Sequence, residues 1–136
     1  MASILKVDDL RGNTAAGDIT ITSEGGSATM QLQQGVAKAW LNLNGTGTIA
    51  ARDSFNISST SDISTGIYTA TVTNSFSNAN FAYSISSGWT SGGQGVHPEV
   101  HEDRITSSVF GLGCINTSNN SADSANIFSS AHGDLA

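Results

Sequence analysis

The densest group of side chains able to do chemistry is the segment HPEVHED, residues 97–103. His97 and His101 are four residues apart, the spacing that places two zinc ligands on one helical turn. Pro98 follows His97 directly and favours an extended backbone there, which argues against the helical zinc geometry. In an extended segment, His97, Glu99 and His101 would share one face. The favoured interpretation is a solvated acidic loop without a metal; a metal site and a pH-responsive contact remain alternatives.

A second candidate is Trp89, which stands between small residues in the stretch SSGWTSGG. A tryptophan in such a loop is either anchored in the core or displayed, where it can stack on a sugar or fill a partner's pocket. We therefore predict Trp89, His97 and His101 as candidate ligand-binding residues.

Catalytic chemistry finds little support in the residue pattern. There is no G-x-S-x-G elbow, and the GLG at residues 111–113 lacks the third glycine and the helix of a phosphate-binding loop. Carboxylates could be paired in space for glycoside cleavage, but nothing favours one pair among Asp53, Asp62, Glu99 and Glu102. The sequence predicts a non-enzymatic protein with no cofactor.

The composition limits the kinds of partner that the protein is expected to bind. The net charge is −6, and the five basic residues are scattered rather than clustered: Lys6, Arg11, Lys38, Arg52 and Arg104. Phosphate contacts need clustered cations, so no nucleic-acid partner is expected. Apolar runs are only a few residues long, so no membrane insertion is expected. Cys114 is the single cysteine and lies in the apolar stretch VFGLGCIN, which predicts a small buried hydrophobe.

From residue 35 onward the pattern is that of short strands. Residues 67–73 place Tyr68, Ala70 and Val72 on one face, and residues 78–86 alternate Phe81, Tyr83 and Ile85 with small residues. Turn signals recur every 8–12 residues, as is typical of sandwiches and barrels. The predicted fold class is all-β, with an antiparallel β-sandwich or barrel-like knob over residues 35–136.

The stretch 37–58 predicts a hairpin. Leu41 and Leu43 point to one side, while Trp40 and Asn42 point to the other. The NGTG at residues 44–47 supplies turn residues that tolerate positive φ. Residues 48–58 are the expected return strand, which is predicted to contribute Ile49, Phe55 and Ile57 to the core.

Residues 1–34 form a different kind of segment. Two short extended stretches, 3–7 and 17–23, are separated by the breaker-rich RGNTAAG, and residues 27–40 form an irregular or briefly helical connector. A few such strands cannot bury enough surface alone, so they need a body or other chains to pack on. We expect an extended segment for oligomerisation or attachment.

Two stretches, ILKVDDLRGNTAAGDITITSEGG and GVAKAWLNLNGTGTIAARDSFNISS, carry a resemblance. They resemble a small module of marine tailed-phage structural proteins described as tail fibre or virion proteins, with the pattern AKAWxNxNGTGTxxxRxSFNxSSxxDxxTGxYT. The resemblance covers about the first 85 residues and matches at residues 37–48, Arg52, 54–59, Asp62, 65–66 and 68–69.

The resemblance implies a virion component that is assembled in the host cytoplasm and is a homotrimer, with contacts to other tail or capsid proteins. It carries over no catalytic residue. Two functions remain open: a tail-fibre-like protein whose knob binds a host-surface glycan or protein, and a capsid decoration or head-fibre protein docked through its N-terminal segment without an essential ligand.

Overall fold

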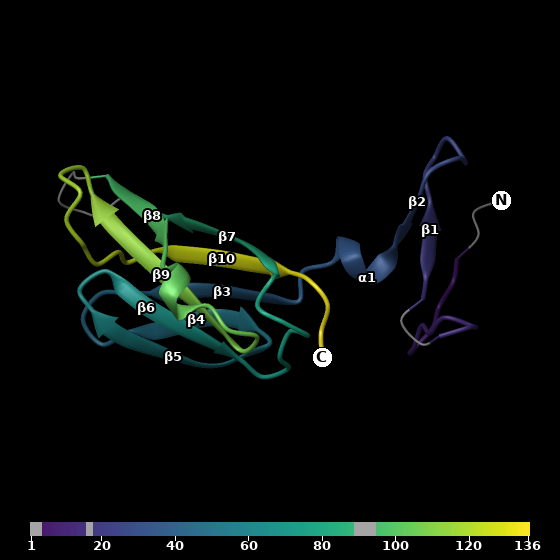
Figure 1. Cartoon of the computed structure of the whole chain (residues 1–136), viewed down its shortest axis with the longest axis horizontal. Helices are drawn as coiled ribbons and strands as arrows, with labels where there is room; N and C mark the ends of the chain where they lie inside the picture. The colour runs from purple at the N-terminus through teal and green to yellow at the C-terminus, as the bar shows by residue number, and fades with distance from the viewer. Residues whose placement is uncertain (1–3, 16–17, 89–94) are drawn as a thin grey trace. The chain divides into compact units, whose positions relative to one another are not determined.

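The computed structural model describes residues 4–15, 18–88 and 95–136. The chain forms two compact units, Met1–Val36 and Ala37–Ala136. The sequence pattern predicts this division between residues 34 and 35, two residues earlier. Strands dominate the second unit, here called the body, which is an antiparallel β-sandwich (Figure 1) and confirms the predicted fold class.

Sheet I of the body has the strand order β4-β3-β10-β7, with every neighbouring pair antiparallel. The C-terminal strand therefore lies in the middle of the sheet, between two strands that come much earlier in the chain. The strands are β3 (Ala39–Asn44), β4 (Ala50–Phe55), β7 (Ala82–Ser87) and β10 (Ile127–His132).

Sheet II has the order β5-β6-β9-β8 and is also antiparallel throughout. Its strands are β5 (Ile57–Ser64), β6 (Ile67–Val72), β8 (Val96–Val100) and β9 (Val109–Asn116). A short 3-10 helix, η1 (Glu102–Arg104), follows β8.

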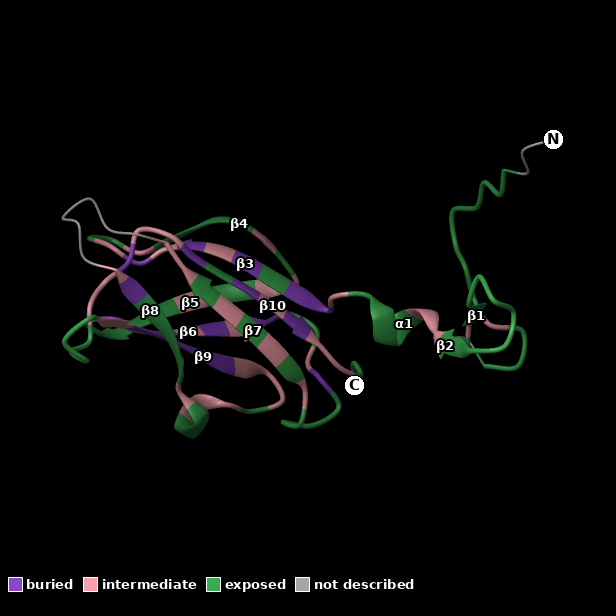
Figure 2. Cartoon of the chain, turned by 90° about the horizontal axis from the view of Figure 1, so that it is seen from above, coloured by how far each residue is buried: buried purple, intermediate pink, exposed green. Residues whose placement is uncertain are grey.

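The core lies between the two sheets. In β3 and β6, every second residue is buried, and Figure 2 shows this alternation along the strands. The predicted alternation is confirmed, and the structure shows which faces are inward: Leu41 and Leu43 are buried from sheet I, and Tyr68, Ala70 and Val72 from sheet II. Aromatic rings close one part of the core, where Phe76 stacks on Phe81 at 4.1 Å and Tyr83 lies 5.5 Å from Phe110. Cys114 is buried, as expected.

Asn56 marks the point where the chain passes from sheet I to sheet II. Its φ of 58° is left-handed, a conformation that asparagine tolerates better than most residues. Its side-chain amide donates hydrogen bonds to the carbonyls of Lys38 (2.9 Å) and Asn74 (3.0 Å), and its Oδ1 accepts one from the Asn74 amide (2.7 Å). Residue 56 thus ties the corner to the start of β3 and the end of β6.

This corner overturns one prediction. The expected single return strand over residues 48–58 is two strands in different sheets, β4 and β5. Ile49 and Ile57 pack against the core as predicted, but Phe55 is 53% exposed. A continuous strand would put residues 55 and 57 on one face, whereas the left-handed residue between them turns Phe55 outward and Ile57 inward.

The segment around His97 is also not a loop. Residues 96–100 form β8, which pairs with β9 at the edge of sheet II. An edge strand accommodates Pro98 because its missing N–H removes no bond from the sheet interior. The expected solvation is nevertheless seen, since residues 97–100 are exposed.

The N-terminal unit contains β1 (Thr20–Thr22), β2 (Thr29–Gln31) and the single helical turn α1 (Leu32–Gly35). β1 and β2 form a two-stranded antiparallel sheet, and α1 lies within the stretch predicted to be briefly helical. Among the described residues of this unit, none is buried, and Figure 2 colours the unit green and pink throughout. In the described part of the chain, no helix has the length and apolar character needed to cross a membrane.

Candidate functional site

The three predicted ligand-binding residues lie in different settings in the chain. Trp89 lies outside the described residues. His97 is exposed on β8, opposite Ile115 of β9. His101 follows the end of β8 and is half-buried, with its Nδ1 3.8 Å from a carboxylate oxygen of Asp103. The two histidines thus lie at one edge of sheet II.

His101 packs on the backbone of β9. A Cβ atom added at Gly113 would lie 2.6 Å from His101 Cδ2 and 2.8 Å from Nε2. A Cβ atom at Gly111 would lie 2.8 Å from the His101 carbonyl oxygen. The two glycines of the GLG stretch therefore allow the turn after β8 to lie close on the outer surface of sheet II.

The described residues at this edge of sheet II do not provide a set of metal ligands. Across residues 4–15, 18–88 and 95–136, no three His, Cys, Asp or Glu side chains come together in a way that could hold a metal ion. The imidazole of His101 instead lies against Gly113. His97 takes part in strand pairing, and His101 packs on β9.

A more promising surface is the outer side of sheet I. Trp40 on β3 is directly opposite Phe55 on β4, and it is diagonal to Phe128 on β10, whose direct partner is Asn42. The exposed fractions are 37% for Trp40, 53% for Phe55 and 42% for Phe128. We call this surface, with the polar residues beside the rings, the aromatic face: Trp40, Asn42, Asp53, Phe55, Ser84, Ser86, Phe128 and Ser130.

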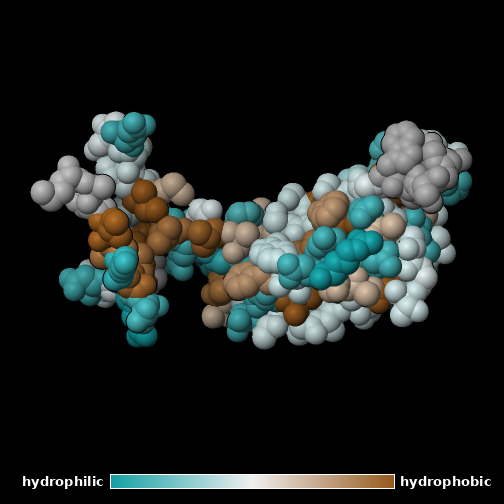
Figure 3. Space-filling view, turned by 180° about the vertical axis from the view of Figure 1, so that it is seen from behind, coloured by the Kyte–Doolittle hydropathy of each residue, from teal (hydrophilic) through white to brown (hydrophobic). Residues whose placement is uncertain are grey.

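Sheet geometry determines how close these rings are. Directly opposite residues in an antiparallel pair have Cβ atoms about 4.5–5.5 Å apart, and diagonal neighbours are about 7–8 Å apart. Trp40 is thus central, with one ring on each side. Figure 3, which shows the protein from the side opposite to Figure 1, has apolar and hydrophilic side chains interspersed over the body.

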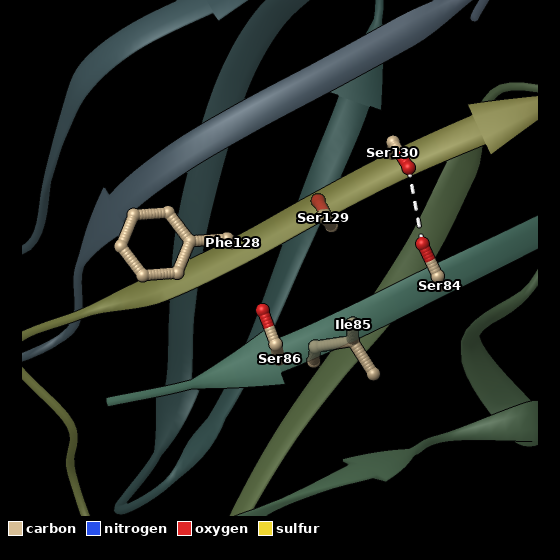
Figure 4. A pocket seen from close by; sticks show the side chains of 6 residues that line it. All are labelled: Ser84, Ile85, Ser86, Phe128, Ser129 and Ser130. Carbon is tan, nitrogen blue, oxygen red and sulfur yellow. Dashed lines mark hydrogen bonds between the residues drawn. The ribbon is translucent and has the colours of Figure 1, made fainter. Parts of the chain in front are cut away.

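A shallow groove runs along β7 and β10 beside the ring of Phe128. Its volume is about 230 Å³, and Figure 4 shows the hydroxyls of Ser84, Ser86 and Ser130 on the same side as that ring. The Ser84 and Ser130 hydroxyls are 3.0 Å apart. The groove is smaller than the roughly 300 Å³ at the lower end of enclosed small-molecule pockets, so it suits a ligand that lies on a surface.

A guanidinium and a carboxylate flank the other end of the aromatic face. The guanidinium of Arg52 lies 3.4 Å from the Leu43 carbonyl and from Asn126 Oδ1, and 3.5 Å from Asn42 Oδ1. A bulge in the β3–β4 register places Arg52 at this position. Asp53 Oδ1 accepts a hydrogen bond from the Ser54 amide, and its side chain is exposed.

The groups with clearly perturbed acidity are elsewhere, in the core. Burial raises the pKa of Tyr68 far above its ordinary value, and the hydrogen bond to Asp123 acts in the same direction. Burial also raises the pKa of Tyr83, and that of the Cys114 thiol to about 11. These shifts favour the uncharged forms of interior groups. The aromatic face, in contrast, presents rings and hydroxyls, which are suited to binding by stacking and hydrogen bonding.

Comparisons with known proteins add no relative. No protein-family model, no curated protein and no solved structure matches the chain.

The aromatic face was not predicted from the sequence, although part of the signal was present. The alternation in residues 39–44 correctly separated Trp40 and Asn42 from the buried leucines. Phe55 was assigned to the core, and Phe128 was not singled out. Their proximity depends on the pairing of β3 with β10, whose residues are far apart in the sequence.

Proposed function

We propose that the protein is a non-enzymatic structural component of a phage virion, tail-fibre-like, that is anchored through its N-terminal unit and presents the β-sandwich to a host surface. The proposal includes assembly in the host cytoplasm, association as a homotrimer and contacts with other virion proteins. It rests on the resemblance of residues 1–85 to the tailed-phage module and on one structural observation about the N-terminal unit.

The observation is that the N-terminal unit exposes apolar side chains and has no buried core among its described residues. Among its described residues, seven large hydrophobic side chains are exposed, with Ile4 and Leu5 each at 78%. The others are Val7, Leu10, Ile21, Met30 and Val36. Figure 3 shows the brown side chains gathered on this unit. Exposed apolar surface of this kind marks a site of association.

Strand pairing within the unit cannot compensate for the missing core. β1 and β2 contribute three residue pairs, and an isolated two-stranded sheet is marginally stable at best in water. Covering the apolar side chains with other copies or with another virion protein supplies the burial that the unit lacks. An attachment or oligomerisation role follows from this need.

Association of identical copies is also compatible with the charges of the unit. The stretch KVDDLR carries Lys6 and Arg11 beside Asp8 and Asp9, so copies of it can place opposite charges against each other. Closed symmetry is the usual arrangement for such assemblies. These features support association of identical copies, and the number of three copies in the proposal comes from the resemblance to the phage module.

The alternative is a capsid decoration or head-fibre protein that docks through the same unit and has no essential ligand. The coreless N-terminal unit favours this function as well, because it could gain its burial from an apolar surface of the capsid. The two functions differ in what the body does after attachment.

The native mass of the purified protein, measured by size-exclusion chromatography with light scattering, tests the proposal. A homotrimer has a mass of about 42 kDa, three times the chain mass of 13.9 kDa. Replacing Leu5 and Leu10 by Ser should lower the mass to that of one chain, whereas Ile63→Ser on β5, an exposed hydrophobic of the body, should leave it unchanged. A wild-type monomer contradicts the trimer and favours the decoration function; labelled electron microscopy then locates the protein on the particle.

A further inference from the structure

We infer that the aromatic face binds an uncharged saccharide, with the indole of Trp40 as the central stacking surface. This inference rests on the proposed host-surface function for the source of the saccharide, and it adds the ligand class and the residues. It concerns sheet I, a different surface from the N-terminal unit that carries the proposed attachment.

The first argument is the kind of apolar group that is exposed. The large hydrophobic side chains exposed on β3, β4, β7 and β10 are all aromatic: Trp40, Phe55 and Phe128. Two of them flank the third through direct and diagonal strand positions, so they form one continuous surface. Aromatic rings offer flat apolar area at low conformational cost, which suits the C–H face of a sugar ring.

The second argument is the polar groups beside the rings. Sugar hydroxyls need partners that both donate and accept, and serine and asparagine side chains do both. The hydroxyls of Ser84, Ser86 and Ser130 line the groove next to Phe128. Asn42 accepts from Arg52 through its Oδ1, and its amide nitrogen and the Ser86 hydroxyl in the groove are donors that suit a sugar hydroxyl.

The third argument is charge. Arg52 and Asp53 lie at the same end of the face and carry opposite charges. The whole chain has a net charge of −6, which repels anionic ligands. The two opposite charges on the aromatic face cancel, and the acidic protein as a whole repels anions. The aromatic face is therefore complementary to an uncharged partner.

The fourth argument is the backbone that carries the face. Trp40 and Phe128 stand on β3 and β10, the two central strands of sheet I, and their neighbours on the strands are buried. Side chains on paired central strands are held more rigidly than side chains on loops, which lowers the entropic cost of binding.

The test uses the full-length protein and a printed array of glucose-, galactose- and mannose-based neutral oligosaccharides, together with sialylated and sulfated ones. The strongest neutral oligosaccharide is then titrated by calorimetry. We expect binding that weakens at least about tenfold in Trp40→Ala and in Phe128→Ala, with Trp40→Phe closer to the wild type. The control Ile63→Ala, on β5 of sheet II, should bind as the wild type does.

Circular dichroism and native mass, measured on the same samples, exclude a folding or assembly defect as the cause of lost binding. The inference is overturned if the wild type binds no saccharide at about 10 mM, if it binds only anionic saccharides, or if Trp40→Ala and Phe128→Ala bind like the wild type. A trimer found on the virion that binds no saccharide would overturn this inference alone. A protein that binds neutral saccharide through Trp40 but is absent from virions would instead overturn the proposed function.

Discussion

The hydroxyl oxygen of Tyr68 lies 2.8 Å from Oδ1 of Asp123 and 2.8 Å from the carbonyl oxygen of Gly45. The same Asp123 oxygen accepts a hydrogen bond from the Gly66 amide at 2.7 Å. One buried tyrosine on β6 thus joins the loop after β3 to the segment before β10, so the two sheets are linked by polar contacts as well as by apolar packing.

Removing this hydroxyl should destabilise the body. Tyr68→Phe leaves the ring in place but removes the hydroxyl that donates to the buried Gly45 carbonyl and one of the two donors to Asp123, so we expect the free energy of unfolding to fall by about 1–2 kcal/mol. Urea denaturation followed by circular dichroism measures it. Tyr83→Phe is the matched control, since it removes a single bond, to the Gly111 carbonyl at 2.9 Å, and should cost less. Equal or no loss in both variants would contradict a special role for Tyr68.

Alkaline pH should unfold the protein through its two tyrosines. Burial raises the pKa of both Tyr68 and Tyr83, so the folded state holds their protons to higher pH than the unfolded state does. Their contribution to the free energy of unfolding is complete below about pH 10, which is the ordinary pKa of tyrosine. Above that pH the contribution falls, by up to about 1.4 kcal/mol per pH unit for each tyrosine. Tyrosinate absorbance should therefore appear together with loss of the circular dichroism signal. Tyrosinate formation in the folded protein near pH 10 would contradict this.

Cys114 should be inert in the native protein. It is 1% exposed, and burial raises the pKa of its thiol to about 11, so at pH 8 only about one molecule in a thousand carries the reactive thiolate. We expect no alkylation by iodoacetamide over hours, and full alkylation in urea, with mass spectrometry as the readout. Rapid native alkylation would show that β9 opens readily.

The corner at Asn56 should be sensitive to substitution. Asn56→Ala removes three hydrogen bonds and leaves a left-handed φ on alanine, for an expected loss of about 2–4 kcal/mol. Asn56→Gly keeps the backbone freedom and should lose less. Asn119 has a similar φ of 60° in an exposed turn, so Asn119→Ala measures the backbone cost alone, about 1 kcal/mol. Thermal and urea unfolding compare the three variants, and equal losses at residues 56 and 119 would count against the side-chain bonds.

Packing of His101 on β9 gives a further prediction. Gly113→Ala places a methyl group within 2.9 Å of both the His101 ring and the Glu99 carbonyl, so it should cost about 1–3 kcal/mol. Adding His101→Ala should restore only part of this, because the backbone carbonyl remains. Gly95→Ala is the control, since its nearest neighbour would be 3.9 Å away. Urea denaturation measures all three, and an unaffected Gly113→Ala would show that the turn after β8 moves freely.

Local patterns predicted the strands but not where the chain changes sheet. The alternation groups Tyr68, Ala70 and Val72 on one face correctly because it depends only on the period of a strand, and the structure shows this face to be the buried one. Phe55 and Ile57 share that period, and the left-handed residue between them separates their faces. A period of two carries no information about such a turn.

Most of the aromatic face could not be predicted from the sequence either, because local patterns do not show which strands pair. Trp40 was placed on the correct side of its strand, but its neighbours on the aromatic face come from pairings across the sheet. Phe128 becomes a neighbour only because β10 inserts between β3 and β7. His97 and His101 form a cluster in the sequence, and the structure places His97 on an edge strand and His101 against β9.

The central position of β10 has a consequence for biosynthesis. Ala39 pairs with Ala131, so β3 leaves the ribosome long before one of its two neighbours exists. Until β10 is made, β3 has one unpaired edge and β7 has no partner strand in sheet I, and unpaired edges are the kind of surface that pairs wrongly with other chains. The body can therefore complete sheet I only after nearly the whole chain has been translated, and a nascent chain arrested before residue 127 is the species most in need of a chaperone.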